Sequence, residues 1–196
     1  MMEPWYKVAM PRKEVREGRS FNPDEFAIAL EQVVAGTAPQ DYRDPKLFFS
    51  RTCFTRALNE HIGMVLRRLA GKTENTAPVL ALITQFGGGK THTLTALYHL
   101  INNKEKARKI GELNKLIKEA GLPEIPNAQV GVFVGNAWDA SQGAETPWID
   151  IARQLAGDDG IAALGSEAKT KAPGTNNLRK LIDAAGGHVL ILCDEV

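Results

Sequence analysis

The feature that most constrains the fold is a glycine-rich turn between an apolar run and a helix-forming run. The apolar run is Val79–Ile83, the turn is Thr84–Gly89, and Lys90 opens an amphipathic pattern. This is the strand–turn–helix order of a phosphate-binding P-loop, in which glycines let several N–H groups converge on one anion. The helix that begins there adds unpaired N–H groups and the positive end of its dipole.

Two polar residues complete the predicted phosphate site. Lys90 can reach the β- and γ-phosphates of a nucleotide, and the Thr91 hydroxyl can ligate Mg²⁺. The motif usually begins with glycine where this chain has Thr84, and the alternative is a plain glycine-rich turn with a surface lysine. The predicted phosphate-binding residues are Gln85, Phe86, Gly87, Gly88, Gly89, Lys90, Thr91 and His92.

A carboxylate pair follows a second apolar run. Val189–Cys193 is continuous, as expected of a buried parallel strand, and it ends in Asp194 and Glu195. In a Walker B strand the aspartate holds Mg²⁺, usually through water, and the adjacent glutamate polarises the attacking water. An ordinary polar strand end is the alternative, and the preceding P-loop in the right chain order disfavours it. We therefore predict Lys90 and Glu195 as catalytic residues, and Thr91 and Asp194 as metal ligands.

Length and composition fit one globular domain with an appended segment. Of the 196 residues, 43% are apolar and 24% charged, so the chain can bury a core. The net charge of +1 gives no overall argument for a nucleic-acid or membrane partner. Without a signal-peptide or membrane-spanning run, we expect a cytoplasmic protein. We assign residues 1–76 to a solvated arm and a helical segment, and residues 77–196 to the P-loop core.

Hydrophobic periodicity and turn residues predict the remaining elements. Cys53 and Cys193 fall in apolar patterns, so we expect buried, unpaired thiols. Residues 37–49 are predicted to form a loop, and residues 157–176 show little pattern. The predicted strands are 78–83, 129–134 and 189–193, and the predicted helices run from Asn22 to Gly36, from Ser50 to Gly71, over 90–102 and 103–120, after Thr146, and from Asn177 to Ala185.

Several polar residues have a second interpretation. Asn136 and Asp139 follow the strand 129–134, where side chains often line a ligand crevice, but they also suit a local turn. His92 and His99 lie in the helix after the P-loop, and we expect packing or surface positions for both side chains. The basic stretch 103–120 fits a solvated helix face better than a nucleic-acid patch, because glutamates are mixed into it.

The glycine-rich loop together with Leu192–Glu195 resembles ATPases of the additional-strand, catalytic-glutamate division of P-loop proteins, which includes AAA-type ATPases. Four further segments extend the likeness over essentially the whole chain, to the amino-terminal part of a large prokaryotic ATP-binding domain-of-unknown-function family. These segments are Trp5–Ala9, Arg16–Phe21, Asp44–Phe49 and Thr146–Asp150. Members of that family tend to be encoded beside an adenine-specific DNA methyltransferase and a helicase in anti-phage defence loci.

The resemblance implies ATP and Mg²⁺ as ligands, and ATP hydrolysis that drives a motor or switch in the full-length protein. It implies homo-oligomers and, as partners, DNA or defence-system proteins. It also implies a three-layer α/β/α P-loop NTPase fold with a mostly parallel sheet. In that fold a fourth strand separates the P-loop strand from the strand before Asp194, and no such strand precedes Val196. We therefore expect an amino-terminal fragment, incomplete at the carboxyl end, with unpaired backbone and exposed apolar faces.

Three other functions compete with ATP hydrolysis. An ATP-dependent assembly scaffold with little turnover is the main alternative, and the Asp194-Glu195 pair argues weakly against it. A small-molecule kinase is disfavoured, because it needs a lid over the acceptor and uses its acids differently. A GTPase is disfavoured too, since the chain contains no Asn-Lys-x-Asp element for reading guanine.

Overall fold

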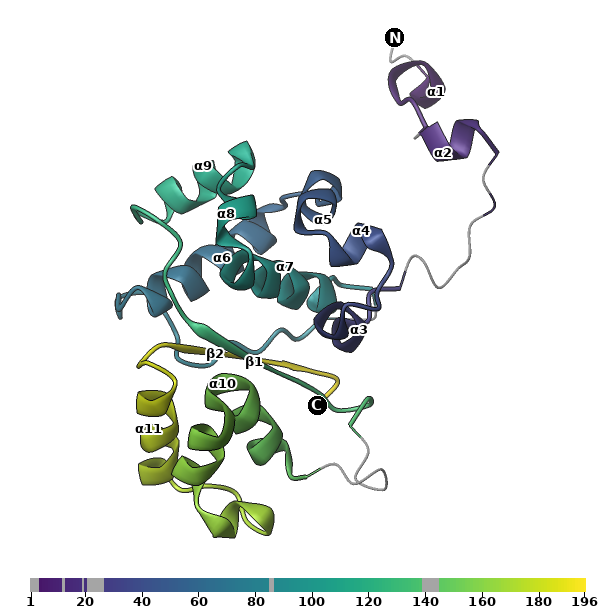
Figure 1. The fold of residues 1–196 in the computed structure, drawn as a ribbon. Coiled ribbons are helices and arrows are strands. Elements are labelled where there is room, and N and C mark those ends of the chain that lie inside the picture. Colours follow the sequence, from purple (N-terminus) through teal and green to yellow (C-terminus); the bar gives the residue numbers. More distant parts are fainter. Residues whose placement is uncertain (1–3, 12, 19, 21–26, 85–86, 139–144) are drawn as a thin grey trace.

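A pair of parallel strands lies at the centre of the computed structural model, between two groups of helices (Figure 1). The structure describes residues 4–11, 13–18, 20, 27–84, 87–138 and 145–196. Strand β1 is Gln129–Val134 and strand β2 is Val189–Asp194, and their register places Gln129 opposite Val189 and Val134 opposite Asp194. Two of the three predicted strands are therefore confirmed.

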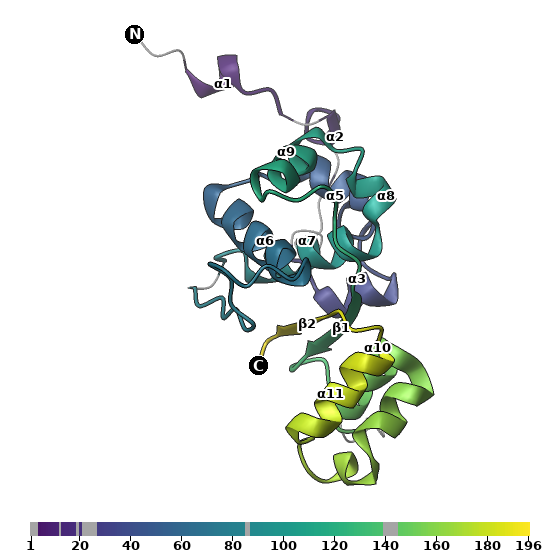
Figure 2. The same ribbon diagram turned by 90° about the vertical axis from the view of Figure 1, so that its left-hand side faces the viewer.

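Helices cover both faces of this sheet, and both views show the layers (Figures 1 and 2). Helix α7 packs against both strands on one face, and α10 packs against β1 on the other. The helices are α1 (Trp5–Val8), α2 (Lys13–Arg16), α3 (Leu30–Ala35), α4 (Gln40–Arg43), α5 (Pro45–Arg51), α6 (Arg56–Leu69), α7 (Lys90–Asn102), α8 (Lys104–Ala107), α9 (Gly111–Glu119), α10 (Pro147–Leu164), the 3-10 helix η3 (Ser166–Lys169) and α11 (Thr175–Ala184).

Each strand contributes apolar side chains to both layers. Val132 of β1 and Leu192 of β2 belong to a core shared with α3, α5, α6, α7 and α9. Phe133 and Val189 pack instead against the core of α10 and α11. Because helices cover both faces of the sheet, side chains on both sides of each strand are apolar, and the sequence of each strand is a continuous apolar run. The first core extends from Leu30 to Leu192, so α3, α5 and α6 pack together with the predicted P-loop core.

The first helices differ from those predicted. Helix α3 begins at Leu30 rather than near Asn22, which lies outside the described residues. It ends as predicted, where Gly36 takes a left-handed conformation with φ of 74°. The helix predicted to start at Ser50 is capped by Thr55 instead, because the Thr55 hydroxyl accepts a hydrogen bond from the backbone N–H of Leu58.

The predicted loop 37–49 contains two helices, α4 and α5. Asp44 caps α5, and its carboxylate accepts a hydrogen bond from the Leu47 N–H at 3.0 Å. Pro45 follows at the first helical position, where a missing N–H costs nothing.

Two later helical regions also depart from the prediction. The stretch 103–120 forms two helices, α8 and α9, rather than one. Helix α10 reaches into the region 157–176, where the sequence shows little pattern, and ends at Leu164. Ala156, with φ of −148°, and Gly157, with φ of 59°, leave the helical conformation, so α10 consists of two helical segments joined by a kink. The predicted last helix is confirmed as α11, which begins at Thr175.

The apolar run 78–83 is not a strand, contrary to the prediction. Among the described residues only β1 and β2 pair, and Val79 and Ile83 are 78% and 92% exposed. An apolar run forms a strand only where a neighbouring strand satisfies its N–H and C=O groups, and this stretch pairs with neither β1 nor β2.

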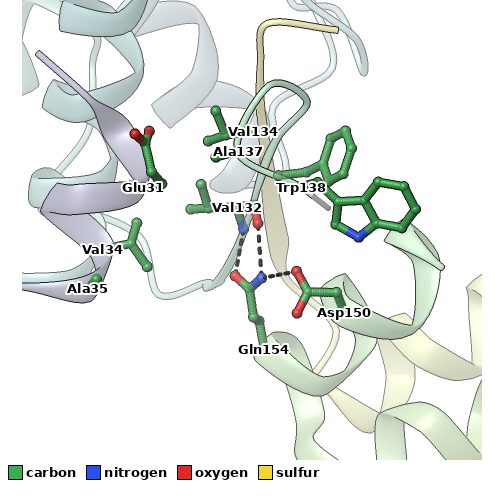
Figure 3. A pocket seen from close by; sticks show the side chains of 10 residues that line it. Glu31, Val34, Ala35, Val132, Val134, Ala137, Trp138, Asp150 and Gln154 are labelled. Carbon is green, nitrogen blue, oxygen red and sulfur yellow. Dashed lines mark hydrogen bonds between the residues drawn. The ribbon is translucent and has the colours of Figure 1, made fainter. Parts of the chain in front are cut away.

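The two edges of the sheet differ in how their backbone is satisfied (Figure 3). In a parallel pair alternate residues point their backbone groups to opposite sides, so Val132 faces away from β2. Gln154 of α10 covers that edge: its Oε1 accepts from the Val132 N–H at 2.8 Å and its Nε2 donates to the Val132 carbonyl at 2.9 Å. Nε2 also donates to Asp150 Oδ2 at 3.0 Å. At the outer edge of β2, no described residue hydrogen-bonds to the backbone of Ile191 or Cys193.

Cys53 and Cys193 are both exposed and unpaired, which corrects the expectation of buried thiols. Cys193 lies in β2, which has no second strand beside it among the described residues. Helices α1 and α2 form an arm that lies apart from the body (Figure 1). Within the described ranges, none of the helices combines the length and apolar character that a bilayer crossing requires.

Candidate phosphate-binding site

The glycine-rich loop ends in a left-handed backbone at the start of α7. Gly87 and Gly89 have φ angles of 78° and 77°, in a region that L side chains rarely adopt. Gly89 caps α7, and its carbonyl accepts from the Thr93 N–H at 2.9 Å. The predicted residues Gln85 and Phe86 lie outside the described part of the chain.

Lys90 folds back over this loop. Its Nζ donates to the Thr84 carbonyl at 3.3 Å and lies 3.4 Å from the Thr84 hydroxyl. The contact joins the two ends of the loop, and Thr84 occupies the position where the motif usually has glycine. Both acceptors are neutral oxygens at long range, and an anionic phosphate oxygen makes a stronger partner for an ammonium group.

Helix α7 is oriented so that its first turn lies on the same side of the molecule as the carboxyl ends of β1 and β2 (Figure 1). The unpaired N–H groups of that turn and the positive end of the dipole of a 13-residue helix therefore lie on the side where Asp194 ends β2. Thr91 is the second residue of this turn and is half-buried. The structure thus places the loop and the carboxylate pair at one end of the sheet.

Asp194 is buried, with 6% of its surface exposed. Leu192 of the same strand packs in the core on the α7 side, and the two-residue period of a strand puts the Asp194 side chain on that face as well. No described residue forms an ion pair or a hydrogen bond with its carboxylate. A carboxylate at the carboxyl end of a parallel strand, with no partner among the described residues, suits a metal ligand.

Gly135 fixes the backbone of the carboxylate pair, and residue-level reasoning missed it. Its N–H donates to the Asp194 carbonyl at 2.9 Å. A Cβ at this position would lie 2.1 Å from the Glu195 carbonyl oxygen, so only glycine allows this close approach. Glu195 itself is exposed and takes a left-handed conformation with φ of 53°. A glycine directly after an apolar strand was the available indication, but the partner is distant in sequence.

The His92 side chain engages α5 rather than the loop. Its ring stacks on Phe48 at a centroid distance of 4.6 Å, and its Nε2 lies 3.0 Å from the Thr52 hydroxyl oxygen. The phosphate-binding role predicted for His92 therefore rests on its backbone N–H in the first turn of α7. Thr52 is a second residue that sequence reasoning missed, and nothing in its local sequence indicates this contact.

Burial lowers the pKa of both histidines of α7, His92 and His99, so we expect neutral rings at neutral pH. His99 is 2% exposed, and its Nε2 lies 2.7 Å from the Tyr42 carbonyl. Because a carbonyl can only accept, this nitrogen carries the proton. The other ring nitrogen, Nδ1, is buried without a hydrogen-bond partner. The expectation that both histidines pack against the protein is confirmed.

A pocket of about 240 Å³ lies on the opposite edge of the sheet, beside β1 (Figure 3). Side chains from α3, β1 and α10 line it, with Glu31 and Asp150 as its carboxylates. None of the predicted phosphate-site residues contributes to this lining, so the pocket is separate from the candidate site. Asn136 is exposed in the turn after β1, and Asp139 lies outside the described residues.

Comparison with known proteins places the chain in a family. The profile of the DUF499 N-terminal domain matches residues 6–124, which is more than half of the 196 residues. The chain belongs to the DUF499 N-terminal domain family. The matched range of this DUF499 chain contains the glycine-rich loop and ends before β1, so Asp194 and Glu195 lie beyond it. No curated protein and no solved structure matched the DUF499 chain.

Proposed function

We propose that the DUF499 chain binds ATP and Mg²⁺ at the loop Thr84–Thr91, and that the full-length protein hydrolyses ATP to drive a motor or switch. The observation that carries the proposal is the Lys90 ammonium, which is held over a loop with left-handed Gly87 and Gly89 at the start of α7. A lysine, converging N–H groups and a helix dipole together favour a phosphate. A P-loop NTPase fold is part of the proposal, supported by helices on both faces of a parallel strand pair.

Each residue has a distinct part in this chemistry. Lys90 and the loop N–H groups would bind and orient the phosphates, and Glu195 would orient the attacking water. Thr91 and Asp194 would hold Mg²⁺, which supplies positive charge beside the β- and γ-phosphate oxygens. The Asp194 carboxylate, which has no partner among the described residues, fits such a ligand. Among the described residues no three His, Cys, Asp or Glu side chains gather around one point, so phosphate oxygens and water would complete the coordination.

Three further parts of the proposal come from the family resemblance. An arginine finger would come from the remainder of the full-length protein or from a neighbouring subunit of a homo-oligomer. DNA or defence-system proteins would be the partners to which ATP turnover is coupled. The site of action would be the cytoplasm.

A binding titration tests the proposal. We expect MgATP to bind the 196-residue chain saturably, and Lys90→Ala to weaken the affinity by about tenfold or more, since it removes a charge-assisted contact. Lys115→Ala is the matched control, because that lysine is a surface residue of α9, 3.7 Å from Glu119, and its loss should leave the affinity unchanged. Equal affinities in all three proteins would contradict the assignment of the loop.

The exposed position of Glu195 keeps an ATP-dependent scaffold with little turnover as a second candidate. A Glu195→Gln variant of the full-length protein separates the two functions, because it retains the size and hydrogen bonding of the side chain but cannot act as a base. We expect loss of phosphate release with nucleotide binding intact. A variant that assembles and functions like the wild type would favour the scaffold.

A further inference from the structure

Two histidines of α7 share one aromatic partner outside the loop. His92 and His99 lie about two helical turns apart, and their rings contact Phe48 of α5 at centroid distances of 4.6 Å and 5.3 Å. Phe48 is almost fully buried. The α4–α5 hairpin, which we define as residues 40–51, is thereby seated against the helix that begins at the glycine-rich loop.

A chain of hydrogen bonds connects the first turn of α7 to the backbone of α5. The Thr52 hydroxyl donates to the Phe48 carbonyl at 2.8 Å, and the same oxygen lies 3.0 Å from His92 Nε2. Because a hydroxyl has one proton, Nε2 of His92 must be the donor in the second contact. Thr52 directly follows α5 and is buried, so both bonds are shielded from competing water.

We propose that His92 is a positioning residue that couples nucleotide occupancy of the loop to the α4–α5 hairpin through Thr52. The inference rests on the proposed function. His92 directly follows Thr91, so a movement of this turn on phosphate binding also moves the imidazole. Phe48 stacks on the face of that ring, and the Thr52 hydroxyl accepts a hydrogen bond from its Nε2. The turn and the end of α5 therefore move together, or the hydrogen bond breaks.

Coupling of this kind is reciprocal. If nucleotide binding changes the affinity of the hairpin for a partner by some factor, then that partner changes the nucleotide affinity by the same factor. The hairpin would be the surface at which the rest of an assembly responds to nucleotide occupancy of the loop, or alters it.

A double-mutant cycle tests the coupling in the 196-residue chain, with MgATP as the probe. Thr52→Val keeps the side-chain volume and removes the hydroxyl, and His92→Phe keeps the ring on Phe48 and removes the donor. We expect each variant to weaken MgATP binding about fivefold, the equivalent of one hydrogen bond. The double variant should also lose about fivefold rather than about 25-fold, because both changes remove the same contact.

Thr95→Val is the matched control. Its buried hydroxyl bonds to the Thr91 carbonyl of its own helix at 2.8 Å and does not reach α5. In the double variant Thr95→Val/His92→Phe, the two fold-losses of MgATP affinity should therefore multiply, as expected of independent sites. A cycle in which the losses from Thr52→Val and His92→Phe also multiply would overturn the coupling.

Hydrogen exchange supplies a readout that a purely structural role would not change. MgATP should slow amide exchange both in the loop and in residues 40–51 of the wild type. Thr52→Val should retain the loop response and lose the hairpin response, and His92→Gln, which keeps a side-chain N–H, should retain both. A protected loop with an unresponsive hairpin in the wild type refutes the coupling but leaves nucleotide binding intact. Absence of any MgATP binding refutes the proposed function, and the coupling with it.

Discussion

Replacing Gly135 with alanine tests whether the end of β1 holds the carboxylate pair in place. The new Cβ would lie 2.1 Å from the Glu195 carbonyl oxygen and 3.1 Å from the carbonyl carbon. Real Cβ atoms essentially never approach other heavy atoms within 3.0 Å, so the two backbones must separate by about 0.9 Å. The obstacle is backbone, which no rotamer change relieves. The same movement stretches the hydrogen bond from the Gly135 N–H to the Asp194 carbonyl, which measures 2.9 Å.

These two effects set the expected magnitude. Overpacking costs about 1–3 kcal/mol and a lost backbone hydrogen bond about 1 kcal/mol. We therefore expect Gly135→Ala to lower the free energy of unfolding by about 2–4 kcal/mol. For a domain of this size each kcal/mol corresponds to about 2–4 °C, so the melting temperature should fall by about 4–16 °C. Urea unfolding followed by far-ultraviolet circular dichroism measures the difference.

Two other glycines calibrate the result. At Gly131 an added Cβ meets the Ile151 side chain at 3.1 Å, and that side chain can shift, so Gly131→Ala should cost less. At Gly174 it meets nothing within 4 Å and φ is −75°, so Gly174→Ala should cost no more than about 1 kcal/mol, the preference for glycine over alanine at the N-cap of α11. The reasoning is refuted if Gly135→Ala unfolds at the same midpoint as Gly174→Ala. If stability falls but MgATP affinity does not, Gly135 does not position the pair.

Two further predictions concern pH and the sheet edge. Burial lowers the pKa of His92 and His99 from the ordinary 6.5, so the unfolded chain binds more protons than the folded chain below that pH, and the urea midpoint should fall on acidification from about pH 7.5 to about pH 5.5. His99→Gln should reduce this slope, and a midpoint independent of pH would contradict the burial of the two rings. Gln154→Glu should destabilise the chain by about 1–3 kcal/mol, and more than Gln154→Met, because it sets a carboxylate against the Val132 carbonyl and the Asp150 carboxylate. Equal urea midpoints for the two Gln154 variants would show that this electrostatic conflict is absent.

β1 and β2 could be predicted correctly because a continuous apolar run is typical of a strand that is buried on both faces of a sheet. The same pattern at 78–83 was misleading, since Val79 and Ile83 are exposed and no described strand pairs with this segment. Periodicity reports which side chains suit a strand, but it does not report whether a neighbouring strand is present. Helices α4 and α5 were missed because four and seven residues carry too little periodicity. Asp44 followed by Pro45 is nevertheless a helix-start signal in the sequence itself.

For the candidate site, local chemistry could be predicted and contacts between distant segments could not. The left-handed glycines and the start of α7 at Lys90 follow from residue types in the loop. The seating of His92 on Thr52 and the approach of Gly135 to Glu195 join segments far apart in the chain, and no local pattern encodes them. The exposure of Cys193 was mispredicted for a related reason, because it depends on what lies beside β2.

The two edges of the sheet differ in how readily they could pair with a further strand. A strand arriving beside β1 would have to displace an amide that already saturates Val132, and it would gain no net hydrogen bond at that residue. A strand arriving beside β2 would meet the open backbone of Ile191 and Cys193 and gain a hydrogen bond at each unmet group. Gln154 therefore blocks the addition of a strand at Val132, whereas no described residue blocks it along Ile191 and Cys193 of β2.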